Sequence, residues 1–244
     1  MPDINKRERL EEEFELEDES QAFVEYDYIT SFIAVNYSLM ADELAKLGDF
    51  EFGVAIDLAC GLGDLAIEVA KRYPKLRITG IDISEKAVEK ARERVKEEGS
   101  DNLDFEIGDV HKLSQEDNSV DLVVSHGGIH HWKDVSRAFS EIYRIMKPGG
   151  LAYLSDLRRD APDEIVKEIE QSLPPAQAKG FINSVRAAYA PEELNKILES
   201  VGIKNFSITD QAFSRETIMK NKELLRKSKM MSSNFSKLSQ IIII

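Results

Sequence analysis

The sequence VAIDLACGLGDLAIEVAKR, residues 54–72, decides how the rest of the chain is interpreted. It opens with a short apolar run that is typical of a buried strand, and it continues with the apolar spacing of a helix. Gly61 and Gly63 lie between the two, with Asp57 before them and Asp64 directly after them. Glycines in such a turn let a ligand approach the backbone closely. The stretch therefore predicts a strand, a binding turn and a helix.

Strand-like and helix-like segments alternate on either side of this stretch. Residues 22–47 have helical spacing, and short apolar runs predict strands at 76–84, 102–109, 120–126 and 151–157. Helices are predicted at 85–99, with Ser84 as N-cap, and from 133 onward until Pro148 and two glycines end the helix. This alternation predicts an α/β fold with a doubly wound, mostly parallel sheet.

The remainder of the chain is predicted to complete one domain over residues 21–244. Residues 157–190 are predicted to form a helical insert that covers the acceptor site. Residues 191–202 are predicted to form a helix and residues 203–210 a strand, with 214–222 as its antiparallel partner. The final QIIII is expected to be an edge strand or a frayed end. Residues 1–20 are acidic, and we expect a flexible tail there.

Composition limits the classes of binding partner and the cellular compartment that we expect. The formal net charge of −13 disfavours nucleic acid and anionic membranes as partners, because binding to phosphates relies on Lys and Arg. The amino-terminal residues are too polar for a signal peptide, and no apolar stretch approaches the length of a membrane span. Cys60 is the single cysteine, which excludes an internal disulfide and suits a reducing cytoplasm. We expect Cys60 to be a packing residue.

Two ligands compete for the glycine turn. Residues 61–66 fit the pattern G-x-G-x-x-[GA] of dinucleotide sites, and Asp82 follows at the spacing of a ribose-binding acid. However, Asp57 and Asp64 would both face the pyrophosphate of a dinucleotide, and like charges are costly there. A ligand with a sulfonium, an amino group and no phosphate fits better. S-adenosylmethionine is such a ligand.

Four pieces of sequence resemble the class I S-adenosylmethionine-dependent methyltransferases, in the group of the ubiquinone/menaquinone-biosynthesis and small-molecule enzymes. The pieces are VAIDLACGLGD, ITGIDIS, FEIGDVHKL and VDLVVSHGGIHHWKDVSRAFSEIYRIMKPGG. The resemblance implies a Rossmann-like methyltransferase fold with seven strands in the order 3-2-1-4-5-7-6. One departure is Ala59, where the family usually has glycine, and alanine implies ordinary backbone angles.

The resemblance also implies a set of cofactor contacts. Asp57, Ala59, Gly61 and Gly63 would line the methionine half, and Asp82 would hold the ribose. The adenine would stack on Ile83 and contact Asp109 and the amide of Val110, Ser125 would lie under the sulfonium, and Tyr26 would offer a cation–π contact. Helix or turn capping is the alternative for Asp57, Asp82 and Asp109, and simple packing is the alternative for Tyr26.

The acceptor side is predicted from the residues after the fourth and fifth strands. His126 is the candidate general base, or else a polar wall of the pocket. His130, His131 and Trp132 resemble a pocket-lining turn of the family. Arg158 and Arg159 are candidates for binding a carboxylate or phosphate, or else form a solvated pair. No metal is expected, since Gly127 and Gly128 argue against a helix that would align His126 and His130.

The predicted activity is methyl transfer to a small-molecule acceptor by in-line displacement. The fourth strand is followed by SHGG, which lacks the motifs of enzymes that methylate base amino groups or cytosine C5. Two alternatives remain open: another group-transfer chemistry with the same cofactor, and a regulatory protein that binds it without catalysis.

Overall fold

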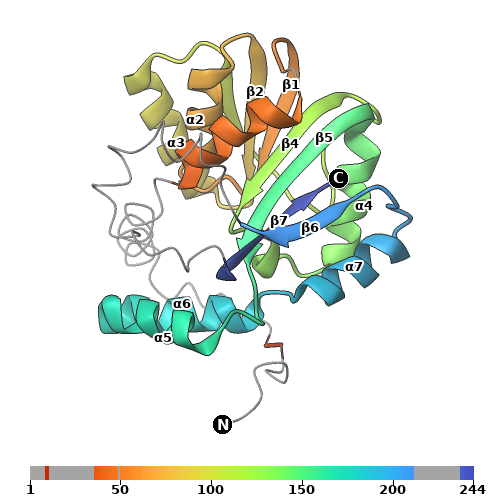
Figure 1. Cartoon of the computed structure of the whole chain (residues 1–244). Coiled ribbons are helices and arrows are strands. Elements are labelled where there is room, and N and C mark those ends of the chain that lie inside the picture. The colour runs from red at the N-terminus through yellow and green to blue at the C-terminus, as the bar shows by residue number, and fades with distance from the viewer. Residues whose placement is uncertain (1–8, 11–35, 49, 212–236) are drawn as a thin grey trace.

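The computed structural model describes residues 9–10, 36–48, 50–211 and 237–244. Residues 36–47 are helical, and the elements that follow are drawn in Figure 1. The strands are β1 (Gly53–Leu58), β2 (Leu76–Asp82), β3 (Leu103–Ile107), β4 (Val120–His126), β5 (Met146–Leu157), β6 (Ser207–Asp210) and β7 (Ser239–Ile243). The helices are α2 (Asp64–Arg72), α3 (Glu85–Glu98), η2 (Ile129–His131), α4 (Val135–Ile145), α5 (Asp163–Ser172), α6 (Pro175–Ala187) and α7 (Pro191–Ser200).

The sheet has seven strands in the order β3-β2-β1-β4-β5-β7-β6, which confirms the predicted fold. The first five strands are parallel, and β7 is antiparallel to both of its neighbours. The order reverses direction at β1, and β4 starts the second half of the sheet beside it. Ligands of such sheets bind outside the carboxyl ends of the strands at this switch point.

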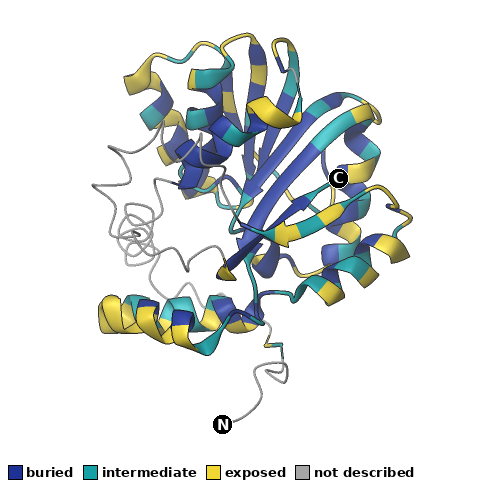
Figure 2. Cartoon of the chain, in the orientation of Figure 1, coloured by how far each residue is buried: buried dark blue, intermediate teal, exposed yellow. Residues whose placement is uncertain are grey.

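The carboxyl-terminal pairing differs from the prediction. The expected partner of β6, residues 214–222, lies outside the described residues. In the structure β6 pairs with β7, and β7 is an interior strand between β5 and β6 rather than an edge strand or a frayed end. Its isoleucines are largely buried, and β6 forms the more exposed edge (Figure 2). The apolar composition of residues 241–244 reflects this interior position.

The helix predicted from residue 133 ends earlier than expected. Helix α4 stops at Ile145, and Pro148 with the two glycines lies in the first half of β5. The amides of Asn118 and Ser119 donate to the carbonyls of Arg144 and Ile145, and Val120 pairs with Met146 across an irregular register. Pairing with β4 therefore ends the helix before the proline is reached.

Helices cover both faces of the sheet. Apolar side chains of helix 36–47, α2 and α3 pack with one face, including Met40, Leu65 and Val88. Side chains of α4 and α7 pack with the other face, among them Phe139, Ile142 and Leu194. In the described part of the chain, no helix is long and apolar enough to cross a membrane.

The predicted insert is helical, as expected, and consists of α5 and α6 with a small apolar cluster of its own. It lies beyond the carboxyl ends of β4 and β5 (Figure 1), and α6 contacts η2. Two residues of the predicted flexible tail are described. Leu10 donates its amide to the carbonyl of Arg186, and the Arg9 guanidinium lies 4.1 Å from the ring centre of Tyr189. This point of the tail contacts the end of the insert.

Candidate functional site

The glycine turn is built as a compact loop between β1 and α2. Gly61 and Gly63 have φ angles of 53° and 82°, in the left-handed region that glycine adopts without strain. The turn is tied to the neighbouring strand, because the Gly61 amide donates to Asp82 Oδ2 at 2.8 Å. A Cβ on Gly63 would lie 2.4 Å from the Phe105 ring. The turn therefore requires glycine at position 63, and its backbone conformation favours glycine at position 61.

Ala59 does not have the ordinary backbone angles that alanine implied. Its φ is 52°, and it is one of two non-glycine residues with positive φ in the described ranges. The turn between β1 and the glycines thus imposes a left-handed conformation on this alanine. The prediction of an ordinary conformation was wrong, because alanine accepts the left-handed region at a cost of about 1–2 kcal/mol.

Asp57 lies at the base of the turn, almost fully buried. Its Oδ2 accepts the amide of Ala66 in the first turn of α2 at 3.0 Å, so it takes the capping role that was the alternative interpretation. Burial raises the pKa of Asp57 well above its usual range, and the carboxylates of Asp82 and Asp64 raise it further. A cation bound nearby would relieve this repulsion.

Asp64 is less available than the sequence argument assumed. Its Oδ1 accepts from Arg94 at 2.8 Å, and Arg94 also donates to the carbonyl of Leu62. Since Asp64 is neutralised in this way, the case against a pyrophosphate rests on Asp57 and Asp82.

Asp82 ends β2, beside the glycine turn. Each carboxylate oxygen accepts one backbone amide, Oδ2 from Gly61 and Oδ1 from Ser84 at 2.9 Å. Carboxylate oxygens accept more than one hydrogen bond, so both retain capacity for a ligand. Ile83 follows and is 74% exposed, and Ile107 at the end of β3 is 53% exposed. Two exposed isoleucines at adjacent strand ends offer an apolar surface for a flat ring.

Asp109 and Val110 follow β3 at the same edge. Asp109 Oδ1 accepts the backbone amide of His111 at 2.9 Å and lies 2.5 Å from His111 Nδ1. These hydrogen bonds lower the pKa of Asp109, which stays ionised. Asp109 thus has the turn contact that was its alternative interpretation, and its Oδ2 is not engaged by it.

His126 ends β4 with its ring edge-on to Tyr37, at 5.1 Å between ring centres. Its Nδ1 is buried without a hydrogen-bond partner among the described residues. Burial lowers the pKa of His126 to about 4, and neighbouring His130 adds to this effect while Asp156 opposes it. The lowered pKa makes His126 a weaker base than an ordinary histidine, which favours the polar wall over the general base predicted from the sequence.

His130 forms a buried pair with Asp156, a residue that sequence reasoning missed. His130 Nδ1 lies 2.7 Å from Asp156 Oδ1, and its amide donates to Oδ2 at 2.8 Å. The side chains are 5% and 3% exposed. Burial would raise the pKa of Asp156, but the charge and hydrogen bonds of His130 lower it below its usual range. An acid at the end of the fifth strand was the only sequence signal for this pair.

The remaining predicted residues are placed as follows. Ser125 is fully buried and donates its hydroxyl to the carbonyl of Leu58 at 2.7 Å, which ties β4 to β1. Trp132 packs edge-on against Phe139 in the core. His131 is exposed, with its ring 3.9 Å from that of His130. Tyr26 lies outside the described residues.

The two arginines after β5 are engaged within the fold. Arg158 pairs with both oxygens of Asp160 at 2.7 Å and with Asp210. Arg159 donates to the carbonyl of Ala188 and pairs with Glu193. Neither guanidinium is held for an acceptor carboxylate or phosphate, and neither belongs to a solvated pair. Most of these contacts could not be predicted from the sequence, because Asp210, Ala188 and Glu193 come from distant segments of the chain.

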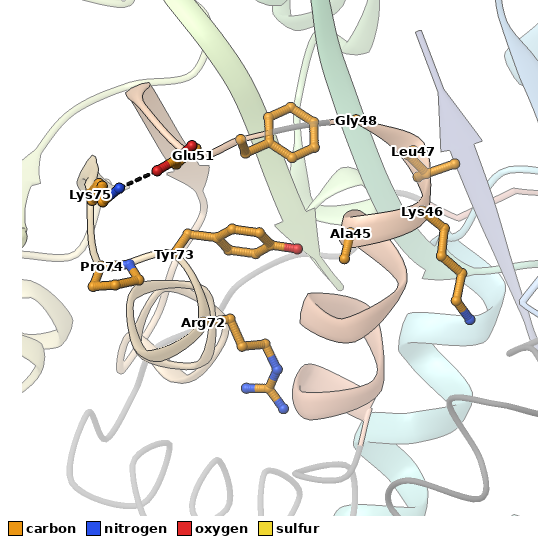
Figure 3. A pocket seen from close by; sticks show the side chains of 10 residues that line it. Ala45, Lys46, Leu47, Gly48, Glu51, Arg72, Tyr73, Pro74 and Lys75 are labelled. Carbon is orange, nitrogen blue, oxygen red and sulfur yellow. Dashed lines mark hydrogen bonds and ion pairs between the residues drawn. The ribbon is translucent and has the colours of Figure 1, made fainter.

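A pocket of about 570 Å³ lies elsewhere, between the end of helix 36–47, the start of β1 and the loop after α2 (Figure 3). Helix α2 begins at the glycine turn and ends at Arg72, which lines this pocket. The pocket therefore lies near the amino ends of the strands, opposite to the glycine turn. It is separate from the site at the carboxyl ends. Within the described ranges, no cluster of three or more His, Cys, Asp or Glu is placed to hold a metal ion.

Comparison with known proteins agrees with this geometry. The methyltransferase domain family matches residues 52–202. A ubiquinone/menaquinone biosynthesis C-methyltransferase from Desulfotalea psychrophila is 36% identical over 107 residues, which cover 44% of this chain and 42% of that protein. The match therefore spans less than half of that relative's length.

Solved structures extend the likeness over most of the fold. A crystal structure from Methanococcus maripaludis, provisionally described as an S-adenosyl-L-methionine-dependent methyltransferase, has a TM-score of 0.66 and 25% identity, covering 96% of each chain. The plantazolicin methyltransferase BpumL, solved with S-adenosylhomocysteine, has a TM-score of 0.71 at 16% identity, covering 95% of this chain and 91% of that one. With its fold, glycine turn and family match, the chain belongs to the methyltransferase domain family.

Proposed function

We propose that this protein transfers a methyl group from S-adenosylmethionine to a small-molecule acceptor. The observation that carries the proposal is the hydrogen bond from the Gly61 amide to Asp82 Oδ2, which brings the glycine turn and the acid of β2 together at the switch point. The turn supplies close backbone approach, and the acid supplies acceptors for ribose hydroxyls.

The residues present fit this cofactor. Asp57 and Asp82 lie close enough to raise each other's cost of ionisation, and this repulsion favours a ligand with a cationic sulfonium and an ammonium group. The exposed side chains of Ile83 and Ile107 would contact the adenine. Asp109 retains a carboxylate oxygen for the adenine amino group. The same acids disfavour the pyrophosphate of a nicotinamide dinucleotide.

When bound, S-adenosylmethionine supplies a methyl group already activated by the sulfonium. The chain's own residues would then hold the acceptor in line and exclude water, which accounts for much of the rate in such displacements. His126, neutral and weakly basic, is better suited to orienting the acceptor than to removing its proton. The proposal therefore favours His126 as a polar wall of the pocket that orients the acceptor, rather than as a general base.

We further propose that the acceptor is a small molecule rather than nucleic acid and that the protein acts in the cytoplasm. The net charge of −13 supports the first, since phosphate backbones are bound by excess positive charge. The single cysteine, which is buried, supports a reducing compartment. Burial also raises the pKa of Cys60, which agrees with a packing role rather than a reactive thiol.

Titration calorimetry tests the cofactor assignment. We expect S-adenosylmethionine and S-adenosylhomocysteine to bind and NADH not to bind. Binding of NADH alone would overturn the proposal. Production of S-adenosylhomocysteine from labelled S-adenosylmethionine in cell extract separates catalysis from binding without turnover. Absence of that product in extracts that contain acceptors would favour a non-catalytic role.

A further inference from the structure

Three buried polar atoms lie without hydrogen-bond partners on neighbouring positions of β4 and β5. They are His126 Nδ1, Ser155 Oγ and Tyr153 Oη, and each lacks a partner among the described residues. An unpaired buried polar atom is costly, and folded proteins contain few of them. Three such atoms on neighbouring register positions point to a partner that lies outside the described residues.

The three side chains share one face of the sheet. His126 pairs in register with Ser155, and Val124 pairs with Tyr153 two residues earlier. Val124 and Tyr153 belong to the apolar cluster that includes Tyr37 of helix 36–47. Because side chains alternate along strands, His126 and Ser155 lie on that same face. The ring of Tyr37 contacts the ring of His126 edge-on.

The location joins these atoms to the proposed reaction. His126 and Ser155 are at the carboxyl ends of their strands, on the edge that carries the glycine turn. Tyr153 lies two residues before Ser155 on β5 and is thus farther from the carboxyl ends of the strands. A molecule held by them would have its polar end beside Tyr37.

The charges around these atoms favour an uncharged partner. The basic residues that directly follow β5, Arg158 and Arg159, are engaged by carboxylates. Glu43, which faces Tyr153 from helix 36–47, pairs with Lys46 at 3.0 Å. The buried carboxylate of Asp156 also acts on His126, but it is paired with His130. The neutral imidazole and the two hydroxyls therefore offer donors and acceptors but no counter-charge of their own. Burying an unpaired charge there would be expensive.

We propose that His126 Nδ1, Ser155 Oγ and Tyr153 Oη bind the uncharged polar end of the methyl acceptor, beside Tyr37. The acceptor class is a neutral, largely apolar molecule that carries a hydroxyl, carbonyl or amide. This proposal rests on the proposed function and adds the acceptor chemistry to it.

Two serine variants provide a matched test on the full chain. Ser155→Ala removes an unpaired hydroxyl, whereas Ser125→Ala removes a hydroxyl that donates to Leu58 on the neighbouring strand. We expect the thermal midpoint of Ser155→Ala to equal or exceed that of the parent and that of Ser125→Ala to fall. A lower midpoint for Ser155→Ala would show that a structural contact or buried water satisfies Ser155, and it would overturn the proposal. Tyr153→Phe repeats the test at the second hydroxyl.

Binding of three probes of equal size tests the acceptor class. With S-adenosylhomocysteine saturating, saturation-transfer NMR compares benzyl alcohol, benzoate and benzylamine. We expect benzyl alcohol to bind at least tenfold more tightly than either charged probe, and Ser155→Ala and Tyr153→Phe to lose this preference. Tighter binding of a charged probe, or an unchanged preference in both variants, would overturn the proposal. Calorimetry with S-adenosylhomocysteine alone shows separately whether the cofactor assignment has failed.

Discussion

Ala59 and Gly128 face each other across the switch point of the sheet. A Cβ built on Gly128 would lie 2.8 Å from the Ala59 Cβ and 3.0 Å from Ser125 Oγ. Gly128→Ala should therefore lower the free energy of unfolding by about 1–3 kcal/mol through overpacking. Urea denaturation measures the change. A variant as stable as the parent would show that the loop between β4 and η2 moves freely to make room.

The same contact predicts that two substitutions are not additive. Ala59→Gly relieves a left-handed alanine but adds freedom to the unfolded chain, so its own effect should stay within about 1 kcal/mol. In the background of Ala59→Gly, Gly128→Ala should cost less than it does alone, since the Cβ that it meets is gone. Equal costs in the two backgrounds would place the strain at Ser125 instead.

Asp82→Ala should weaken the binding of S-adenosylhomocysteine by about 1.5–3 kcal/mol, the range for hydrogen bonds to a charged group. Part of the loss would come from the Gly61 amide, which loses its acceptor. Calorimetry gives the affinity, and circular dichroism checks that the fold survives. Asp104→Ala is the matched control, because Asp104 is an acid on neighbouring β3 whose side chain is 83% exposed. Equal affinities for the two variants would remove Asp82 from the ribose site.

The parts of this fold that depend on local sequence were predictable. The glycine turn, the Ser84 cap and the alternation of apolar runs are each determined within a few residues, and the structure has them as expected. Features that depend on distant partners were not predictable. The place of β7 depends on pairing with β5 and β6, and the end of α4 depends on pairing with β4.

In the candidate site, too, some features follow from the predicted fold and others depend on residues that are distant along the chain. The placement of Asp82 beside Gly61 follows from the fold, whereas the pairing of Arg158 with Asp210 joins residues that are 52 positions apart. Asp156 was overlooked because an acid at a strand end is common, and its partner His130 becomes visible only when β5 and η2 are brought together. The depressed pKa of His126 also comes from burial by other segments.

Asp156→Asn should destabilise the protein by about 3–5 kcal/mol, as expected when one partner of a buried charged pair is removed. The asparagine side chain offers one acceptor where the carboxylate serves both the ring and the amide of His130. Denaturant unfolding measures the loss, with Asp104→Asn as the control at an acid whose side chain is 83% exposed. Equal stabilities would show that Asp156 contributes nothing net to the fold.

His126 should make the free energy of unfolding depend on pH between about pH 6.5 and about pH 4. Its pKa is about 4 in the folded protein and about 6.5 in the unfolded chain, so the unfolded state binds the proton first as the pH falls. The favourable contribution is complete above pH 6.5 and is lost between there and pH 4. At pH 5 the loss amounts to at most about 2 kcal/mol relative to pH 8.

His126→Gln removes this titration while it keeps a polar side chain of similar length. The stability of the variant should change less than that of the parent between pH 6.5 and pH 5, because carboxylates titrate in both proteins and cancel in the difference. Urea midpoints measured every half pH unit give the two curves. Parallel curves over this window would mean that His126 has an ordinary pKa in the folded protein. In that case a general-base role at neutral pH would regain its physical basis, and orientation of a neutral acceptor would lose part of its support.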